Sequence, residues 1–425
     1  MKPRLRQEAV VLVTVLGVAS LFSTLAVAHP APGRAAPTSS PATVPPRVGT
    51  TLTRSPTAVL QPTAALQPTG PLEPTGPLEP TGALQPTAPA WQPRRFTVVG
   101  TGDVLLHQGL WRQARADGHG RGMDFRPLFA GIKPVIAGAD LAVCHLETPL
   151  GRPGGPFTGY PVFTVPPQVV PALKDTGFDS CSTASNHSLD AGLDGIRRTL
   201  DALDAAGLAH TGTARSPQER ATTTMLNVAG VRVAQLSYAY GFNGIPRPKG
   251  KEWAANLIKT ATILADARTA KERGAEVVIV SLHWGTEYQH SATAEQASIA
   301  RTLLASPDID LILGHHAHVV QPFEEIGGEW VAYGHGNLVS TQSFSADTRD
   351  GVISRFTFAE MAPGRFRVVL AEALPVYMRL GSGAARVLLV SACVRGKGST
   401  AADCAASGRR TTKVIRSRRA TVPVA

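Results

Sequence analysis

Short apolar runs alternate with polar segments through the middle of the chain. The runs are rich in β-branched residues and are bounded by Gly, Asp or other polar residues, as buried strands are. We expect strands at 96–100, 141–146, 179–184, 231–238, 277–282, 310–313 and 330–333. Two later runs, 352–358 and 366–371, indicate further β structure.

Between these runs, apolar residues recur every three or four positions, as on one face of a helix. The clearest faces comprise Leu193, Ile196, Leu200 and Leu203, then Leu257, Ala261, Leu264 and Ala265, and then Ile299, Leu303 and Leu304. Strands that alternate with helices predict an α/β fold.

The residues before the first strand follow different patterns. Met1 to Glu8 is basic, and residues 9–28 are apolar and end in Ala26-Val27-Ala28. This pattern predicts a signal peptide or a signal anchor over residues 1–28, and both cleavage and retention fit it. No cysteine follows the run, which excludes a lipoprotein anchor.

Residues 29–94 are rich in Pro and Thr and contain a six-residue repeat. The repeat units are LQPTAA, LQPTGP, LEPTGP, LEPTGA and LQPTAP. A proline in every unit prevents a helix or a central strand. We therefore predict a disordered, extended stalk that precedes a folded domain at 95–380.

The formal net charge of +11 is concentrated at the end of the chain. From Arg379 onward there are ten Lys and Arg residues and one Asp, so we expect residues 381–425 to form a basic, flexible tail. A solvated end is the simpler interpretation, and binding to anionic lipid or to a polyanion is the alternative. Because most of the charge lies outside the domain, we expect no nucleic-acid partner.

The four cysteines do not have zinc-site spacing. Cys144 and Cys181 lie in apolar runs, where we expect them to be small buried hydrophobic residues. Cys393 and Cys404 flank a short polar segment, and in an oxidising compartment they either pair or stay free.

Side chains that can bind metal follow five of the predicted strands. Because the carboxyl ends of strands form the binding crevice of open α/β sheets, we expect them to converge. They are Asp103, Glu147, Asn186 with His187, His283, and the run His315, His316 and His318. Carboxylate, amide and imidazole groups suit Mn, Zn or Fe. A single histidine after a strand is usually structural, so the prediction of a metal site rests on the whole set.

These motifs resemble the CapA family of capsule and poly-gamma-glutamate biosynthesis proteins, within the calcineurin-like metallophosphoesterase fold group. The matching segments are Gly102-Asp103, Leu146 to Pro149, Ser185 to Asp190, His283 to Tyr288, Gly314 to His318, and Tyr333 with Gly336-Asn337. The resemblance implies a metallophosphatase-like two-sheet sandwich flanked by helices. It also implies that His187 is the general acid. The ligands that it implies for one or two divalent ions are Asp103, Glu147, Asn186, His283, His316 and His318.

The chain departs from the family pattern at two positions. The phosphoesterases have Asp-x-His in the first motif, whereas this chain has Asp103-Val104-Leu105. This removes one ligand of the first metal. The second motif has His145 where the family usually has Asn.

The resemblance implies a CapA-like protein of capsule or poly-gamma-glutamate-type polymer biosynthesis or export, with a metal-dependent hydrolase site. Its partners would be an anionic envelope polymer or a phosphoester substrate, and a membrane complex for polymer synthesis and export. The alternative is a non-catalytic, membrane-tethered scaffold or polymer-binding component of that machinery. With either function, the protein would be secreted or anchored in the cell membrane, and its domain would lie outside the cytoplasmic membrane.

The topology can be tested with reporter fusions. Lys and Arg residues before an apolar run stay in the cytoplasm, so the domain should lie outside. Alkaline phosphatase fused after Arg95 should be active in cells, because this reporter folds only outside the cytoplasm. An inactive phosphatase fusion together with an active cytoplasmic reporter at the same position would contradict the predicted topology.

Overall fold

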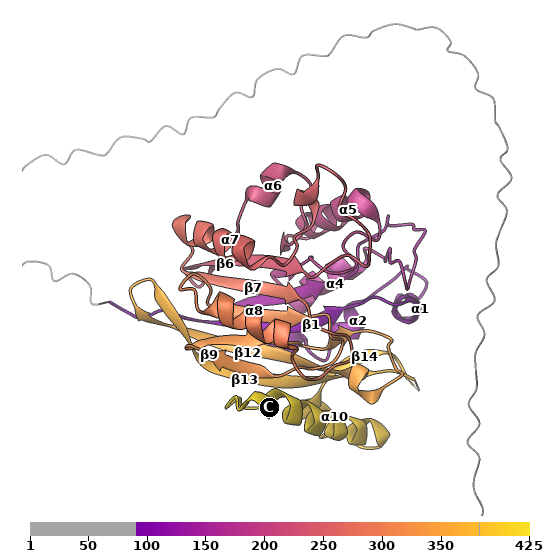
Figure 1. Ribbon diagram of the computed structural model, residues 1–425. Helices are drawn as coiled ribbons and strands as arrows, with labels where there is room; N and C mark the ends of the chain where they lie inside the picture. The colour runs from indigo at the N-terminus through magenta and orange to yellow at the C-terminus, as the bar shows by residue number, and fades with distance from the viewer. Residues whose placement is uncertain (1–90, 382) are drawn as a thin grey trace, which may run out of the picture. The chain divides into compact units, whose positions relative to one another are not determined.

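Two β-sheets pack face to face in the computed structural model, which describes residues 91–425 apart from residue 382 (Figure 1). The predicted signal segment, 1–28, and residues 29–90 of the predicted stalk lie outside this part of the chain. Within it, no helix combines the length and the apolar character that crossing a membrane requires.

The first sheet has eight strands in the order β14-β13-β12-β1-β2-β3-β4, and β11 pairs with β1. Strands β1 to β4 are parallel, whereas β12, β13 and β14 are antiparallel to their neighbours. The strands are β1 (Arg95–Val104), β2 (Leu141–Leu146), β3 (Ser180–Ser182), β4 (Ala209–Thr211), β11 (Asn337–Val339), β12 (Asp350–Ala362), β13 (Arg365–Arg379) and β14 (Arg386–Leu389).

The second sheet has six strands in the order β5-β6-β7-β8-β10-β9. Its central strands β6, β7, β8 and β10 are parallel. The strands are β5 (Thr224–Val228), β6 (Val231–Ala239), β7 (Val277–His283), β8 (Leu311–His315), β9 (Phe323–Ile326) and β10 (Glu329–Ala332). Each predicted run of the sequence corresponds to a strand in one of the two sheets.

Helices cover the outer faces of both sheets. They are α1 (Gln108–Asp117), α2 (Arg126–Phe129), α3 (Lys133–Ile136), α4 (Val169–Thr176), α5 (Gly192–Ala205), α6 (Pro217–Ala221), α7 (Thr260–Glu272), α8 (Ala294–Leu304), α9 (Val390–Cys393) and α10 (Ser399–Ile415). Figure 1 shows α7 and α8 against the second sheet, and their apolar residues form one buried cluster with that sheet.

One apolar core lies between the sheets. Val98 and Phe356 of the first sheet pack in one cluster with Ile279 and Leu313 of the second. Because helices also cover the outer faces, the central strands are buried on both sides and their sequences are continuously apolar. The prediction of an α/β fold with two packed sheets flanked by helices is confirmed.

The C-terminal segment is folded, so the prediction of a flexible tail over residues 381–425 is wrong. Strand β14 pairs with β13, and α10 packs on β13 (Figure 1). The buried side of α10 consists of Cys404, Ser407, Thr411 and Ile415. Two of these residues are polar, so an apolar periodicity does not reveal the buried face.

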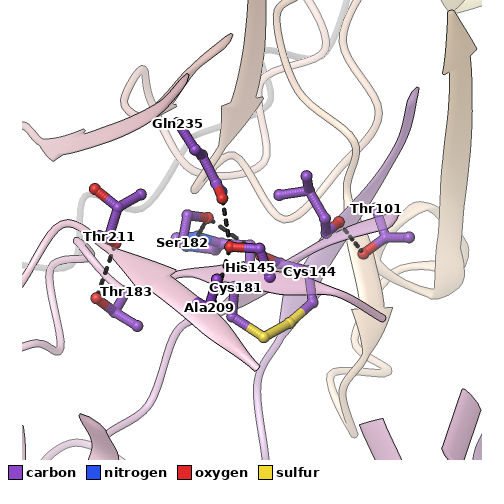
Figure 2. The surroundings of a disulfide bond; sticks show 11 residues. Thr101, Cys144, His145, Cys181, Ser182, Thr183, Ala209, Thr211 and Gln235 are labelled. Carbon is purple, nitrogen blue, oxygen red and sulfur yellow. Dashed lines mark hydrogen bonds between the residues drawn. A yellow bond between two sulfur atoms is a disulfide. The ribbon is translucent and has the colours of Figure 1, made fainter. Parts of the chain in front are cut away.

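Both pairs of cysteines form disulfides. Cys393 bonds to Cys404 and ties α9 to α10, with 6.1 Å between their Cα atoms. Cys144 bonds to Cys181, and Figure 2 shows this bond next to His145. The expectation that Cys144 and Cys181 are buried is confirmed, but the sequence analysis did not predict that they pair. The register of β2 against β3 places them directly opposite each other, and the sequence does not contain that register.

The Cys393–Cys404 disulfide should help to hold α10 on the first sheet. Replacing both Cys393 and Cys404 with Ser should destabilise α10 by up to about 3 kcal/mol, because the unfolded segment gains loop entropy. Hydrogen exchange should then show faster exchange of the α10 amides, while the amides of β7 keep their protection. Unchanged protection of α10 in the double variant would show that packing alone holds the helix.

Candidate metal centre

The candidate site lies where strands of both sheets end. In the first sheet, the β1–β2 register pairs Asp103 with His145. In the second sheet, the β7–β8 register pairs His283 with His315. Since β1 and β2, and likewise β7 and β8, are parallel, each pair lies at the carboxyl ends of its strands. The two-sheet packing therefore brings together side chains that are far apart in the sequence.

Three overlapping groups of side chains can each hold a metal ion, because their ligand atoms lie within 4.8 Å of one another. The groups are Asp103 with His145 and His283, Asp103 with Glu147 and His318, and Glu287 with His316 and His318. Asp103 and His318 each belong to two groups. Except for Glu287, all these side chains are buried. The shared members join the groups into one cluster that can hold adjacent ions.

The cluster contains buried polar atoms without hydrogen-bond partners. Among the described residues, both carboxylate oxygens of Glu147, Oδ1 of Asp103 and Nδ1 of His316 lack a partner. Burying a carboxylate without a partner is costly, and buried charges are normally paired or bound to a metal. Oxygen and imidazole ligands of this kind suit a divalent cation. The residues present therefore fit a divalent metal.

The backbone of the histidine run is strained. His316 and His318 have φ angles of 90° and 55°, in the left-handed region that non-glycine residues rarely adopt. Such conformations cost about 1–3 kcal/mol each and persist where the surrounding structure enforces them. The backbone N–H of His316 donates to Oδ2 of Asp103 at 3.3 Å. The carbonyl of Ala317 accepts from the backbone N–H of Tyr288 at 2.7 Å.

Asn337 and Asp103 position His318. Nδ1 of His318 lies 3.1 Å from Oδ2 of Asp103 and 3.1 Å from Oδ1 of Asn337. The side-chain amide of Asn337 donates to the carbonyl of Thr348 at 3.0 Å. Partners of this kind fix the ring orientation of a ligating histidine.

The charges in the cluster are coupled. Burial by itself lowers the pKa of His318, but the carboxylates of Glu147 and Asp103 raise it to about 9. Burial opposes ionisation of Asp103, yet His315 and His318 beside it hold the pKa of that carboxyl well below its usual range. Burial raises the pKa of Glu147 well above its usual value. The cluster thus favours a bound cation that would stabilise both carboxylates as anions.

A chain of hydrogen bonds connects His145, His283 and Asn186. The bond between Nε2 of His145 and Nδ1 of His283 is 2.9 Å, and that between Nε2 of His283 and Oδ1 of Asn186 is 3.0 Å. Nδ1 of His145 is 2.8 Å from the hydroxyl of Ser182. Burial lowers the pKa of His145 and of His283 well below the usual value, so both rings are neutral. Neutral imidazole is the form that binds a metal.

His187 lies beside the cluster and outside the three ligand groups. Its Nδ1 bonds to Oδ2 of Asp190 at 2.7 Å, and its ring packs edge-on against Phe163. His187 also lines a pocket of about 700 Å³ together with Asn186 and His318. This position gives His187 access to the pocket, and its role as a general acid stays a prediction.

The rim of this pocket is aromatic. Tyr160, Tyr288 and Phe344 line it and are 80%, 43% and 67% exposed. None of the described residues that line the pocket is a Lys or Arg. The pocket is therefore open to solvent and carries no permanent side-chain cation.

All six residues that the sequence singled out as ligands come together here. Asp103, Glu147, His283, His316 and His318 belong to the ligand groups, and Asn186 is hydrogen-bonded to His283. His315 stacks on His145, with ring centroids 4.0 Å apart, and belongs to none of the groups.

The sequence prediction left out two members of the groups, His145 and Glu287, and two positioning residues, Asp190 and Asn337. Asp190, Glu287 and Asn337 lie within the motifs that identified the site, and His145 directly precedes the motif that begins at Leu146. The position of His145 at a strand end, directly before Leu146-Glu147, was the available signal. Glu287 lies in an exposed loop, and no pattern in the sequence distinguishes it.

Comparison with known proteins matches part of the chain to a family. Residues 97–342 match the family model described as bacterial capsule synthesis protein PGA_cap. The PGA biosynthesis protein CapA of Bacillus subtilis (strain 168) is 30% identical over 223 residues, 50% of this chain and 56% of that protein. The capsule biosynthesis protein CapA of Bacillus anthracis is 30% identical over 193 residues, 44% of this chain and 46% of that protein. The chain thus spans about half the length of these curated relatives.

Similar solved structures include the calcineurin-like phosphoesterase YfkN from Bacillus subtilis. It is 15% identical, with a TM-score of 0.39, over 76% of this chain and 100% of that chain. Because this TM-score is low, we infer the function of the site from the residues of this chain.

Metal removal should destabilise the protein. A ligand that binds only the native state stabilises it, so chelation should lower the melting temperature of the metal-loaded protein. Glu147→Gln removes a buried carboxylate whose oxygens have no hydrogen-bond partner, so bound metal should fall and chelation should shift the melting temperature less. Elemental analysis and thermal melts measure both quantities.

The matched control is Glu272→Gln, which changes an exposed carboxylate on α7. It should leave the metal content and the chelation shift as in the unaltered protein. Equal metal content in the Glu147→Gln and Glu272→Gln proteins would show that Glu147 is not a ligand.

Proposed function

The chain belongs to the bacterial capsule synthesis protein PGA_cap family, and from this we propose that it acts in the biosynthesis or export of an anionic, polyglutamate-type envelope polymer through a metal-dependent hydrolase site. Its substrate class would be a phosphoester, or an ester or amide bond of the polymer. The family relation supports the polymer, and the cluster of buried ligands supports the chemistry.

The unpartnered carboxylate of Glu147 is the observation that carries the hydrolase proposal. A structural role does not require a buried carboxylate whose two oxygens have no hydrogen-bond partner. Nor does it require strained backbone at His316 and His318. Strain and perturbed titration that coincide beside a pocket are typical of a functional site. A bound divalent ion would be a partner for the buried oxygen and nitrogen atoms that have none.

One or two divalent ions fit the cluster, with Mn, Zn or Fe favoured by the mixture of carboxylate and imidazole ligands. Asp103 belongs to two of the ligand groups, as a ligand shared by two ions does. A bound ion would polarise a substrate oxygen and activate water for attack.

His187 is the general acid of the proposed reaction. Asp190 accepts a hydrogen bond at Nδ1 of His187, which leaves Nε2 to deliver a proton to the leaving group. Proton transfer by a positioned side chain contributes ~10²–10⁴-fold in rate. The side-chain amide nitrogen of Asn243 lies 3.4 Å from the same ring nitrogen, but the shorter contact is the one to Asp190.

The proposal places the domain outside the cytoplasmic membrane, anchored or secreted. The pattern of residues 1–28 supports this location. The two disulfides support it independently, because disulfides persist in oxidising compartments and are rare in the cytosol. A polymer-synthesis complex in the membrane is the expected partner.

A non-catalytic scaffold is the second candidate function. The observation that favours it is Leu105, which stands where the phosphoesterases have the histidine of their first motif and is buried. The loss of one ligand weakens the hold on one ion. A single ion still polarises a substrate oxygen, so we expect slow but measurable hydrolysis.

Substitution of His187 separates the two functions. His187→Ala should keep its metal, because His187 is outside the ligand groups, and should slow the hydrolysis of an activated phosphodiester by ~10²–10⁴-fold. Asp190→Asn should have a smaller effect in the same direction, and His316→Ala should lose both metal and hydrolysis. Elemental analysis and turnover of bis(p-nitrophenyl) phosphate are the measurements.

Two other results would exclude the hydrolase or change the role of His187. If the unaltered and His187→Ala proteins are equally inert while polymer export in cells still needs the intact domain, the hydrolase is excluded and the scaffold stands. Loss of metal from the His187→Ala protein would instead show that His187 is a metal ligand.

A further inference from the structure

The C-terminal unit carries a second feature that the metal centre does not use. This unit consists of β14, α9, α10 and the residues after them, and it lies beyond the matched residues 97–342. The Cys393–Cys404 disulfide and the buried face of α10 hold it on β13. The C-terminal unit is therefore attached to the first sheet by both packing and a disulfide.

The solvent side of α10 carries a row of cations. Arg409, Lys413 and Arg416 are exposed, and they are spaced by four and three residues along α10 and its end. On a helix, this spacing places side chains on one face at intervals of about 5 Å along the axis. The row points away from the buried face that begins at Cys404.

The row borders an open groove of about 620 Å³. Arg409, Lys413 and Arg416 line one side of it. The rest of its surface is mainly apolar and includes Val390, Val394 and Val424. The groove therefore combines an apolar floor with a cationic edge.

The cations of this groove form no ion pairs with described carboxylates. Other arginines of the unit do, since Arg386 pairs with Asp117 and Arg418 pairs with Glu324. Between residues 386 and 425, Asp403 is the one acidic residue. The groove consequently keeps a positive field that is available to an anion from solution.

The metal-site pocket is electrostatically different. Its described lining residues contain no Lys or Arg, and they include Asp190 and Glu287. The lining of the metal-site pocket thus offers a polyanion no Lys or Arg side chain, whereas the groove offers three.

We propose that the groove beside α10 binds an anionic polymer that carries one carboxylate in each monomer unit. This inference rests on the proposed function for the identity of the polymer and goes beyond it in separating polymer binding from the metal site. Cations at each turn of α10 can pair with successive carboxylates, and the apolar floor can contact the methylene groups between them.

Nucleic acid fits the groove less well. Single-stranded nucleic acid is normally held by bases that stack on aromatic side chains. None of the described residues that line the groove is aromatic.

The test measures binding of poly-gamma-glutamate of defined length to the full chain in detergent. The double variant Arg409→Gln with Lys413→Gln should bind about tenfold more weakly, with a weaker dependence on salt, because fewer counterions are released. The matched control is Arg268→Gln with Arg301→Gln, which removes the same charge from the exposed surfaces of α7 and α8. The control should bind the polymer as the unaltered protein does.

Further measurements distinguish a loss of charge from misfolding and compare the polymer with other anionic ligands. Arg409→Lys with Lys413→Arg keeps both charges and should retain binding, and equal melting temperatures show that the variants are folded. The inference is overturned if the groove variant binds normally, or if the control loses as much affinity. It is also overturned if anionic vesicles or an oligonucleotide bind the groove more tightly than the polymer.

His316→Ala distinguishes this inference from the proposed hydrolase. It should bind the polymer normally, because the groove is separate from the metal ligands. If it loses polymer binding while the groove variant keeps it, the polymer binds at the metal site and the inference fails. If the unaltered protein holds no metal but the groove still binds the polymer, the hydrolase fails and the inference stands.

Discussion

The burial of Asp103 and Glu147 between histidines is the constraint on which the rest of the site depends. Their carboxylates lie where the strands of two sheets end, and both are almost inaccessible to solvent. The imidazoles of His315 and His318 compensate Asp103, whereas Glu147 has no hydrogen-bond partner among the described residues. Strained backbone at His316 and His318 holds the nearby rings in place. A bound cation would compensate the buried negative charge. The apolar core between the sheets holds the strand ends, and with them these side chains, in place.

Catalysis and polymer binding are separate in this account. The metal centre opens into a pocket with an aromatic rim and no lining Lys or Arg, whereas the cationic groove lies on the C-terminal unit. In the proposed function, this separation would keep affinity for the polymer apart from the chemistry of one bond.

The sequence predicted the central features of the fold and site because both depend on local patterns. Buried parallel strands need continuous apolar runs, and ligands at strand ends follow those runs directly, as Asp103 and His283 do. The sequence did not reveal contacts that depend on register, such as the pairing of Cys144 with Cys181. It also missed the packing of α10, because Ser407 and Thr411 on its buried face are polar, so no apolar periodicity marks that face.

Anomalous diffraction from crystals of the metal-loaded protein shows whether the buried cluster binds an ion. Data collected on both sides of the absorption edge of the metal identify the ion and its position. We expect one or two peaks within coordination distance of Asp103, Glu147 and His318. The absence of a peak at these residues under metal-replete conditions, or a peak confined to another part of the chain, would contradict the account.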